Sequence, residues 1–284
     1  MALLAMTATA LAGCVDLRPS TAVDPEHLVR GVAVLRSLPE ALPAKSAPVP
    51  HAQIVLLPSE SAAQLLVPVP FVGEAVEGAF HASAADSLGK RLASLDPYRQ
   101  VLSALQASQV VKVTTSTAPG EMTLRPFVFM QDCADDRYRL TLVAHLQGGD
   151  WVGRYLVHLP TTYSQADYAQ PTPQVLATME REIGSGAVQL RQLVERGARG
   201  QLGPSGVRAD VGSLHLVGVR AIGLMSPNIV RARDVDLIEE GPDHVIVRMR
   251  GDMTMATSAG GLFFGVHLLR KDQLHAFTKH GSAS

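Results

Sequence analysis

The chain contains 284 residues, of which 46% are hydrophobic and 18% are charged, and its formal net charge at pH 7 is −1. The near-zero net charge argues against a nucleic-acid binder, because proteins that attract phosphates are usually basic. The composition is too apolar for a disordered chain. No apolar run reaches the roughly 18 residues that a membrane-spanning helix needs. The length allows one large domain or two smaller ones.

The first fourteen residues combine an uncharged apolar stretch with a cysteine. Residues 1–13 carry no charged side chain and end in small residues, which is typical of a secretory signal peptide and its cleavage site. The sequence Leu11-Ala12-Gly13-Cys14 resembles the lipobox of bacterial lipoproteins. It departs from that family's pattern in that no Lys or Arg precedes the apolar stretch.

The resemblance to lipoproteins implies a covalent lipid anchor. Cleavage would fall between Gly13 and Cys14, and acyl chains such as palmitate would be attached at Cys14. Several chains anchor a protein where one does not, at about 0.8 kcal/mol per buried CH₂. In this family an Asp directly after the cysteine retains the protein in the inner membrane. Val15 therefore favours the outer membrane of a Gram-negative cell, with the protein facing the periplasm.

Cys133 is the second of only two cysteines. If Cys14 is acylated, no intramolecular disulfide can form, and the folded part relies on its core. Cys133 is then either a buried residue that packs like an apolar one or a free thiol.

Residues 14–50 are interpreted as a proline-rich tether between the anchor and the folded domain. Six prolines fall in this range, at positions 19, 25, 39, 43, 48 and 50. Such a stretch favours extended conformations and excludes a long helix. A short helix is compatible with Glu26–Leu38, and the folded part is expected to begin at His51.

The first half of the folded part is predicted to contain strands and two helical segments. Gln53–Leu57 and Val110–Thr117 read as strands, and Met122–Met130 reads as a strand interrupted by Pro126. A helical region is expected over 71–95. Asp96-Pro97 forms an N-cap and first helical residue, and the apolar stripe of the helix that follows comprises Tyr98, Val101, Leu102 and Leu105.

Arg137–His158 is the clearest predicted hairpin. Apolar and polar residues alternate on both sides of Gly148-Gly149, where glycine tolerates the positive φ of a tight turn. This turn sets Leu146 opposite Trp151. The alternation predicts one buried apolar face and one polar face.

The second half begins with a long helix from Thr172-Pro173 to Arg199. Strands follow over 212–224, 229–238, 244–250 and 262–269, and the turn at 239–243 joins two of them into a hairpin. The predicted fold class is α+β, mainly antiparallel sheet with about three helices. The domain over 51–284 is either one unit or two packed halves, 51–168 and 172–284.

The polar face of the predicted hairpin is the candidate polar site. It carries His145, His158, Arg139 and Arg154. A metal would require both imidazoles and a carboxylate to converge, and a solvated or helix-covered face is the simpler interpretation. The motifs that mark common hydrolases, nucleotide-binding loops and metal centres are absent from the sequence. We therefore predict no metal, no cofactor and no catalytic set.

Two apolar segments are candidate partner contacts. Their residues are Leu66, Val67, Val69, Phe71, Phe263 and Phe264. Exposed apolar segments mark interaction surfaces, whereas buried ones are simply core. The sequence favours a lipid-anchored binding or scaffolding module with an envelope protein as partner, rather than an enzyme. The alternatives are an envelope hydrolase that uses His145 or His158, and a hydrophobic-ligand carrier with a large apolar cavity.

Overall fold

The computed structural model is α+β and is built around one large mixed sheet. It describes residues 28, 31–40, 42, 47–57, 89–114, 122–133, 137–164, 166–167, 170–213, 230–249, 264–274 and 276–280. The sheet has 12 strands in the order β12-β8-β9-β10-β11-β7-β6-β5-β1-β4, with β2 and β3 attached beside β5. Most neighbouring strands in this part of the chain are antiparallel, so the predicted class is confirmed, although parallel pairs also occur.

The centre of the sheet consists of three long strands, β5 (Met122–Cys133), β6 (Arg137–Gly148) and β7 (Trp151–Ser164). The two strands of the predicted hairpin are confirmed, because β6 and β7 pair in antiparallel fashion. Its turn lies at Gly149-Asp150, with Gly149 at φ +58°, and Gly148 pairs with Trp151. The predicted register was wrong by two residues. Because side chains alternate with a period of two, this shift leaves every residue on its predicted face.

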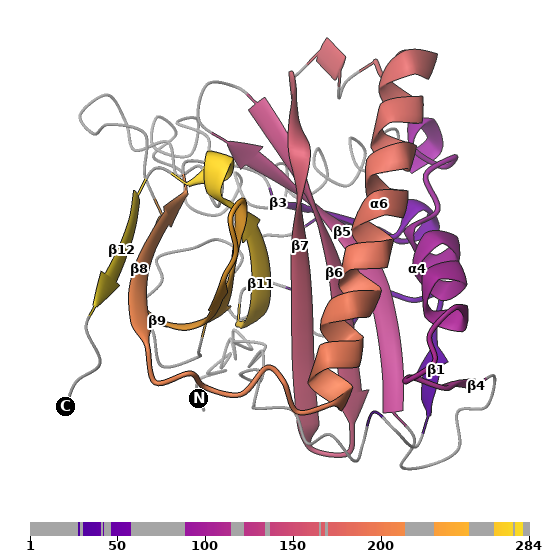
Figure 1. Ribbon diagram of the computed structural model, residues 1–284. Coiled ribbons are helices and arrows are strands. Elements are labelled where there is room, and N and C mark those ends of the chain that lie inside the picture. The colour runs from indigo at the N-terminus through magenta and orange to yellow at the C-terminus, as the bar shows by residue number, and fades with distance from the viewer. Residues whose placement is uncertain are drawn as a thin grey trace, which may run out of the picture.

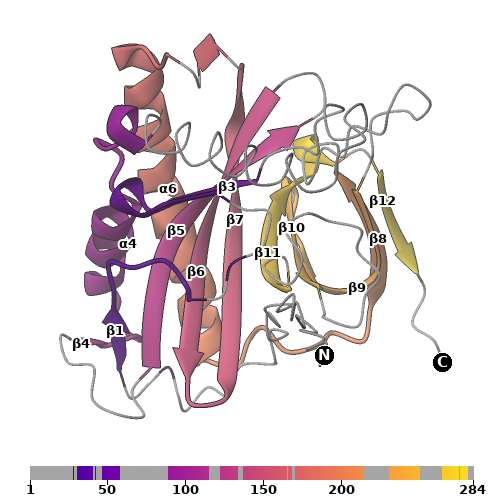
Figure 2. The same cartoon turned by 180° about the vertical axis from the view of Figure 1, so that it is seen from behind.

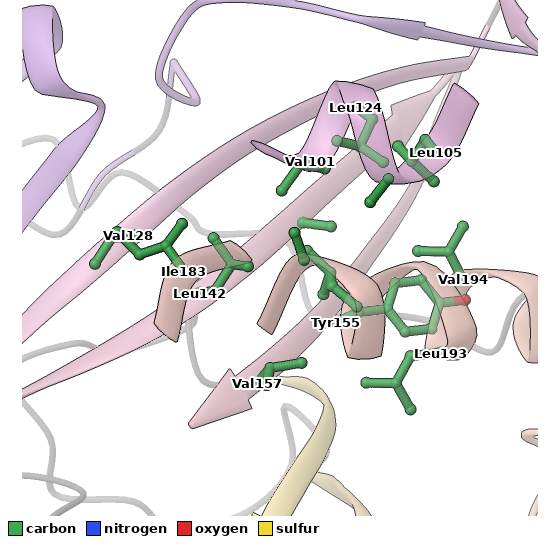
Figure 3. Packing of buried hydrophobic residues seen from close by; sticks show 14 of the residues in the cluster. Val101, Leu105, Leu124, Val128, Leu142, Tyr155, Val157, Ile183, Leu193 and Val194 are labelled. Atoms are coloured by element: carbon green, nitrogen blue, oxygen red, sulfur yellow. The ribbon is translucent and has the colours of Figure 1, made fainter. Parts of the chain in front are cut away.

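Two helices cover one face of these strands (Figure 1). Asp96 caps α4 (Pro97–Gln106) by accepting from the Arg99 N–H, and Thr172 caps α6 (Pro173–Ala198) in the same way at Val175, as the sequence predicted. Their apolar stripes pack on β5–β7, as Figure 3 shows for Val101, Leu142 and Ile183. Among the helices described, none is long and apolar enough to cross a membrane.

The remaining strands form the second half of the sheet. They are β8 (Arg208–Ser213), β9 (Val230–Glu240), β10 (His244–Met249), β11 (Gly265–Arg270) and β12 (Ala276–His280). The predicted hairpin between β9 and β10 is confirmed. The strand β11 runs parallel to β7 and joins this half to the centre. Figures 1 and 2 show that the second half curls away from the helices, on the other side of β5–β7.

The interruption predicted at Pro126 does not break β5, because the neighbouring strand changes at this residue. β1 (Val32–Val34) pairs with β5 before Pro126, and β3 (Ile54–Leu57) pairs with it afterwards. The missing N–H of Pro126 faces the gap between the two neighbours. Gln53, at φ +49°, fills this gap by donating from Nε2 to the Pro126 carbonyl at 3.0 Å.

Several boundaries differ from those predicted. Inside the range assigned to the tether, Val32–Val34 and Ala47–Val49 (β2) are strands of the sheet. Of the short helix compatible with 26–38, Leu28 is helical, but the chain is strand from Val32. The strand expected over 110–117 is described only at Val113–Thr114 (β4). The C-terminal strand β12 was not predicted. Strands from 51–168 and from 172–284 pair through β7 and β11 into one sheet.

Two short 3-10 helices complete the described elements, η1 (Pro50–Ala52) and η4 (Lys271–Gln273). The first leads into Gln53 at the gap beside Pro126. The second follows β11 directly, and the buried side chain of its last residue, Gln273, donates to the Leu159 carbonyl at 3.1 Å. This bond ties the end of the β11 segment to β7.

Gly197 lets the last turn of α6 rest on the buried ring of Tyr155. A Cβ at position 197 would overlap the Tyr155 hydroxyl oxygen. We expect Gly197→Ala to lower the free energy of unfolding by about 1–2 kcal/mol, because overpacking outweighs the ~1 kcal/mol gain in helix propensity. Urea unfolding monitored by circular dichroism measures this change.

The matched control for Gly197→Ala is Gly184→Ala in the same helix, where a Cβ meets only the flexible end of Gln100, at 3.2 Å. This variant should be neutral or stabilising. Adding Tyr155→Phe to Gly197→Ala should restore part of the lost stability. Equal effects of the Gly197 and Gly184 substitutions would contradict the packing explanation.

Candidate functional site

Both faces of the central strands are buried, which corrects the prediction of one solvated or helix-covered polar face. The face opposite α4 and α6 packs against β8–β10 through a second apolar cluster. That cluster is made of Val55, Phe127, Phe129, Val143, Leu156, Ala209, Val211, Val235, Leu237, Val245, Val247, Met249 and Leu269. We call this side of β5–β7 the inner face. The physical cause is the curl of the sheet, which turns its far half onto the hairpin.

The predicted site residues all lie on the inner face and are all buried. Their relative exposures are 4% for Arg139, 6% for His145, 2% for Arg154 and 3% for His158. Charged side chains are rarely this buried, because leaving water costs them free energy. The inner face is therefore the candidate functional site.

Three basic side chains form a row across the inner face near the hairpin turn. Arg125 of β5 is directly opposite His145 of β6, which is directly opposite Arg154 of β7. We call this set the basic row. Burial, reinforced by the charges of Arg154 and Arg125, lowers the pKa of His145 to about 3. Burial also lowers the pKa of Arg154 to about 10. His145 is therefore neutral and Arg154 is cationic at neutral pH.

Each arginine of the basic row contacts a different neighbouring segment. Arg125 donates to the hydroxyls of Ser37 (3.3 Å) and Thr123 (3.0 Å). Arg154 donates from Nη1 to the Phe264 carbonyl at 3.4 Å. The backbone of Gly265 runs so close to Arg154 that a Cβ there would lie 2.5 Å from the Arg154 carbonyl oxygen. The row thus extends from the segment after β1 to the beginning of β11.

A hydrogen-bonded chain lies farther along the same face. The Thr141 hydroxyl and His158 Nδ1 are 3.0 Å apart, and His158 Nε2 and His267 Nδ1 are also 3.0 Å apart. The two imidazole rings are nearly parallel, at 14°. Burial, and then the proximity of His267 and Arg139, hold the pKa of His158 well below its ordinary value. A neutral His158 donates from one ring nitrogen and accepts at the other, which matches its two contacts.

The structure separates the two histidines that the sequence placed on one face. Val143 and Leu156 form an apolar pair between the His145–Arg154 pair and the Thr141–His158 pair. His158 faces Thr141 instead of Arg139, which pairs with Thr162 across a bulge. His145 and His158 therefore belong to two separate polar groups. In the described segments, no three His, Cys, Asp or Glu side chains converge as metal ligands.

Three residues of these groups were not predicted. Arg125 has a sequence signal, because it alternates with Phe127 and Phe129 on the same strand face. Thr141 has the same signal on the next strand. His267 has none that links it to His158, because parallel pairing between β7 and β11 joins segments 109 residues apart.

Other predicted site residues lie mostly outside the described part of the chain. This applies to the lipidation and cleavage positions Gly13 and Cys14, and to Leu66, Val67, Val69, Phe71 and Phe263. Phe264 is described and is half-buried beside Arg154. Cys133 ends β5 opposite Arg137.

No protein-family model, curated protein or solved structure matches this chain.

Proposed function

We propose that this protein is a lipid-anchored lipoprotein of the bacterial cell envelope whose sheet domain binds or scaffolds an envelope partner. The lipobox-like sequence Leu11-Ala12-Gly13-Cys14 carries the proposal. The anchor would be acyl chains on Cys14, and Val15 favours the periplasmic side of the outer membrane. The net charge of −1 suits contact with protein or envelope polymer better than contact with nucleic acid.

The position of the first strand limits how far the domain can reach from the membrane. Eighteen positions separate Cys14 from Val32, where β1 begins. At most ~3.6 Å per residue, this segment spans no more than about 65 Å. The start of the sheet domain would therefore lie within this distance of the lipid surface.

The binding role also agrees with the construction of the domain. Apolar clusters pack against both sides of the central strands and stabilise the described sheet, as a binding scaffold requires. The hydrolase alternative has less support, because His145 and His158 are buried in separate polar groups and each is opposite a residue that is not acidic, Arg154 and Thr141. A ligand carrier requires an apolar cavity. Between the two halves of the sheet, the side chains of the second apolar cluster pack against one another, which gives the carrier alternative less support.

The anchor is tested by intact-mass spectrometry of the protein from membrane and soluble fractions. The native chain should lose residues 1–13, gain the mass of a lipid modification and stay with the membrane. Cys14→Ala should keep the precursor mass and lose this modification. Cys133→Ala is the matched control and should behave as the native chain. Identical masses and membrane partition for native and Cys14→Ala protein would contradict the proposal.

A further inference from the structure

We propose that the basic row, Arg125–His145–Arg154, binds a compact oxyanion, namely a phosphate or carboxylate group, on the inner face of the sheet. The inference goes beyond the binding role proposed above and does not depend on the lipid anchor. It rests on the cross-strand register, on the burial of His145 and Arg154 and on one unmade hydrogen bond.

The basic row concentrates positive charge. The register places two guanidinium groups on either side of one imidazole, on three adjacent strands. The hydrogen bonds that Arg125 makes with described residues go to the hydroxyls of Ser37 and Thr123, which do not neutralise its charge. Guanidinium groups present forked N–H donors that match phosphate and carboxylate oxygens. A negative group between these strands would meet donors from both sides.

The Nδ1 atom of His145 is buried and has no hydrogen-bond partner among the described residues, and the side chain as a whole is 6% exposed. Buried polar atoms of native proteins nearly always have a partner, so one without a partner calls for an explanation. An oxyanion oxygen would accept a hydrogen bond from the Nδ1–H of His145. It would also reverse the electrostatic effect of the two arginines on this ring.

The two ends of the basic row differ in their access to solvent. The Arg154 end of the row is closed by the β11 backbone at Gly265. The Arg125 end differs, because Arg125 is only half-buried and its partner Ser37 is exposed. A ligand group therefore reaches the row from the β5 side, past Ser37. This geometry suits a small anionic group, free or carried at the end of a larger molecule.

The test uses the full-length protein in detergent, with chloride added to keep ionic strength constant. Inorganic phosphate, acetate and monomeric short-chain phosphatidylglycerol are titrated separately, and binding is followed by calorimetry and by the melting temperature. Binding of phosphate or acetate would support a site for a free oxyanion. Binding of the phospholipid alone would support a site for a lipid headgroup. Failure of all three probes to bind would overturn the proposal.

Two variants locate the binding. Arg125→Met should weaken it about tenfold or more, because one charge-assisted contact is lost. Arg181→Met, which removes an exposed arginine of α6, is the matched control and should leave the affinity unchanged. Arg125 is only half-buried, so its variant is expected to fold. Equal affinities of native protein and Arg125→Met would overturn the proposal.

The chemical shifts of the His145 ring distinguish anion binding from a purely structural role of this residue. Nuclear magnetic resonance of labelled histidine should show the His145 shifts changing with phosphate, while those of His244 on the surface stay constant. A bound anion favours the protonated ring. Acetate, which stays ionised over this range, should therefore bind more tightly at pH 5.5 than at pH 7.5. A pH-independent affinity together with unchanged His145 shifts would contradict an anion site beside His145.

Discussion

Lowering the pH from 7.0 to 5.0 is expected to reduce the free energy of unfolding by about 2 kcal/mol through His145 alone. The pKa of His145 is about 3 in the fold, against 6.5 for an unperturbed histidine. The unfolded chain therefore takes up the proton first, and the stability present above pH 6.5 is lost as the pH falls toward 3. His158 adds a loss of the same sign, because its pKa is also lowered.

Urea unfolding in piperazine buffer, free of phosphate and carboxylate, measures this loss. His145→Gln should remove most of the His145 contribution and flatten the pH dependence. On the surface, hydrogen bonds with Asp243 and Glu239 raise the pKa of His244, so that this residue opposes the loss as the pH falls. His244→Gln should therefore steepen the dependence. The assignment fails if native protein and His145→Gln lose stability equally.

Gly265→Ala is expected to destabilise the protein by about 2–3 kcal/mol. The added Cβ would lie 2.5 Å from the carbonyl oxygen of Arg154 and 2.9 Å from its Cβ. Neither atom can rotate away, because one is backbone and the other is fixed to it. β11 must therefore move from β7, and this pair joins the two halves of the sheet.

Hydrogen exchange followed by mass spectrometry shows where the Gly265→Ala variant opens. Protection of backbone amides should fall first in β7 and β11, while the amides of α4 and of the part of α6 packed against it stay protected. Gly203→Ala is the matched control, because the nearest atom to its Cβ is a backbone oxygen at 3.9 Å. A Gly265→Ala protein as stable as this control would show that the close approach is not a constraint.

Local sequence signals identified the elements that local forces determine. The caps Asp96 and Thr172 fix the starts of α4 and α6, since each side chain satisfies an N–H of the first turn. Alternation found β6 and β7 and assigned each residue to its face. It missed the register, because Gly148 and Gly149 both qualify as the first turn residue and only cross-strand packing distinguishes them.

The surroundings of the polar face depend on contacts distant in sequence. A buried and a solvated polar face have the same alternation, so the four predicted residues gave no sign that β8–β10 cover them. Val32–Val34 is too short and too close to prolines to stand out as a strand, and it forms by pairing with β5. The link between His158 and His267 likewise exists only once β11 lies beside β7.

The parallel junction between β7 and β11 also determines the order in which the protein can fold. Val266 pairs with Tyr155, 111 positions earlier in the chain. Until that late segment arrives, the outer edge of β7 presents unpaired backbone groups, and such edges recruit other chains. Contacts this distant in sequence also slow folding. Newly synthesised chains would therefore be most prone to aggregation just before their last strands are complete.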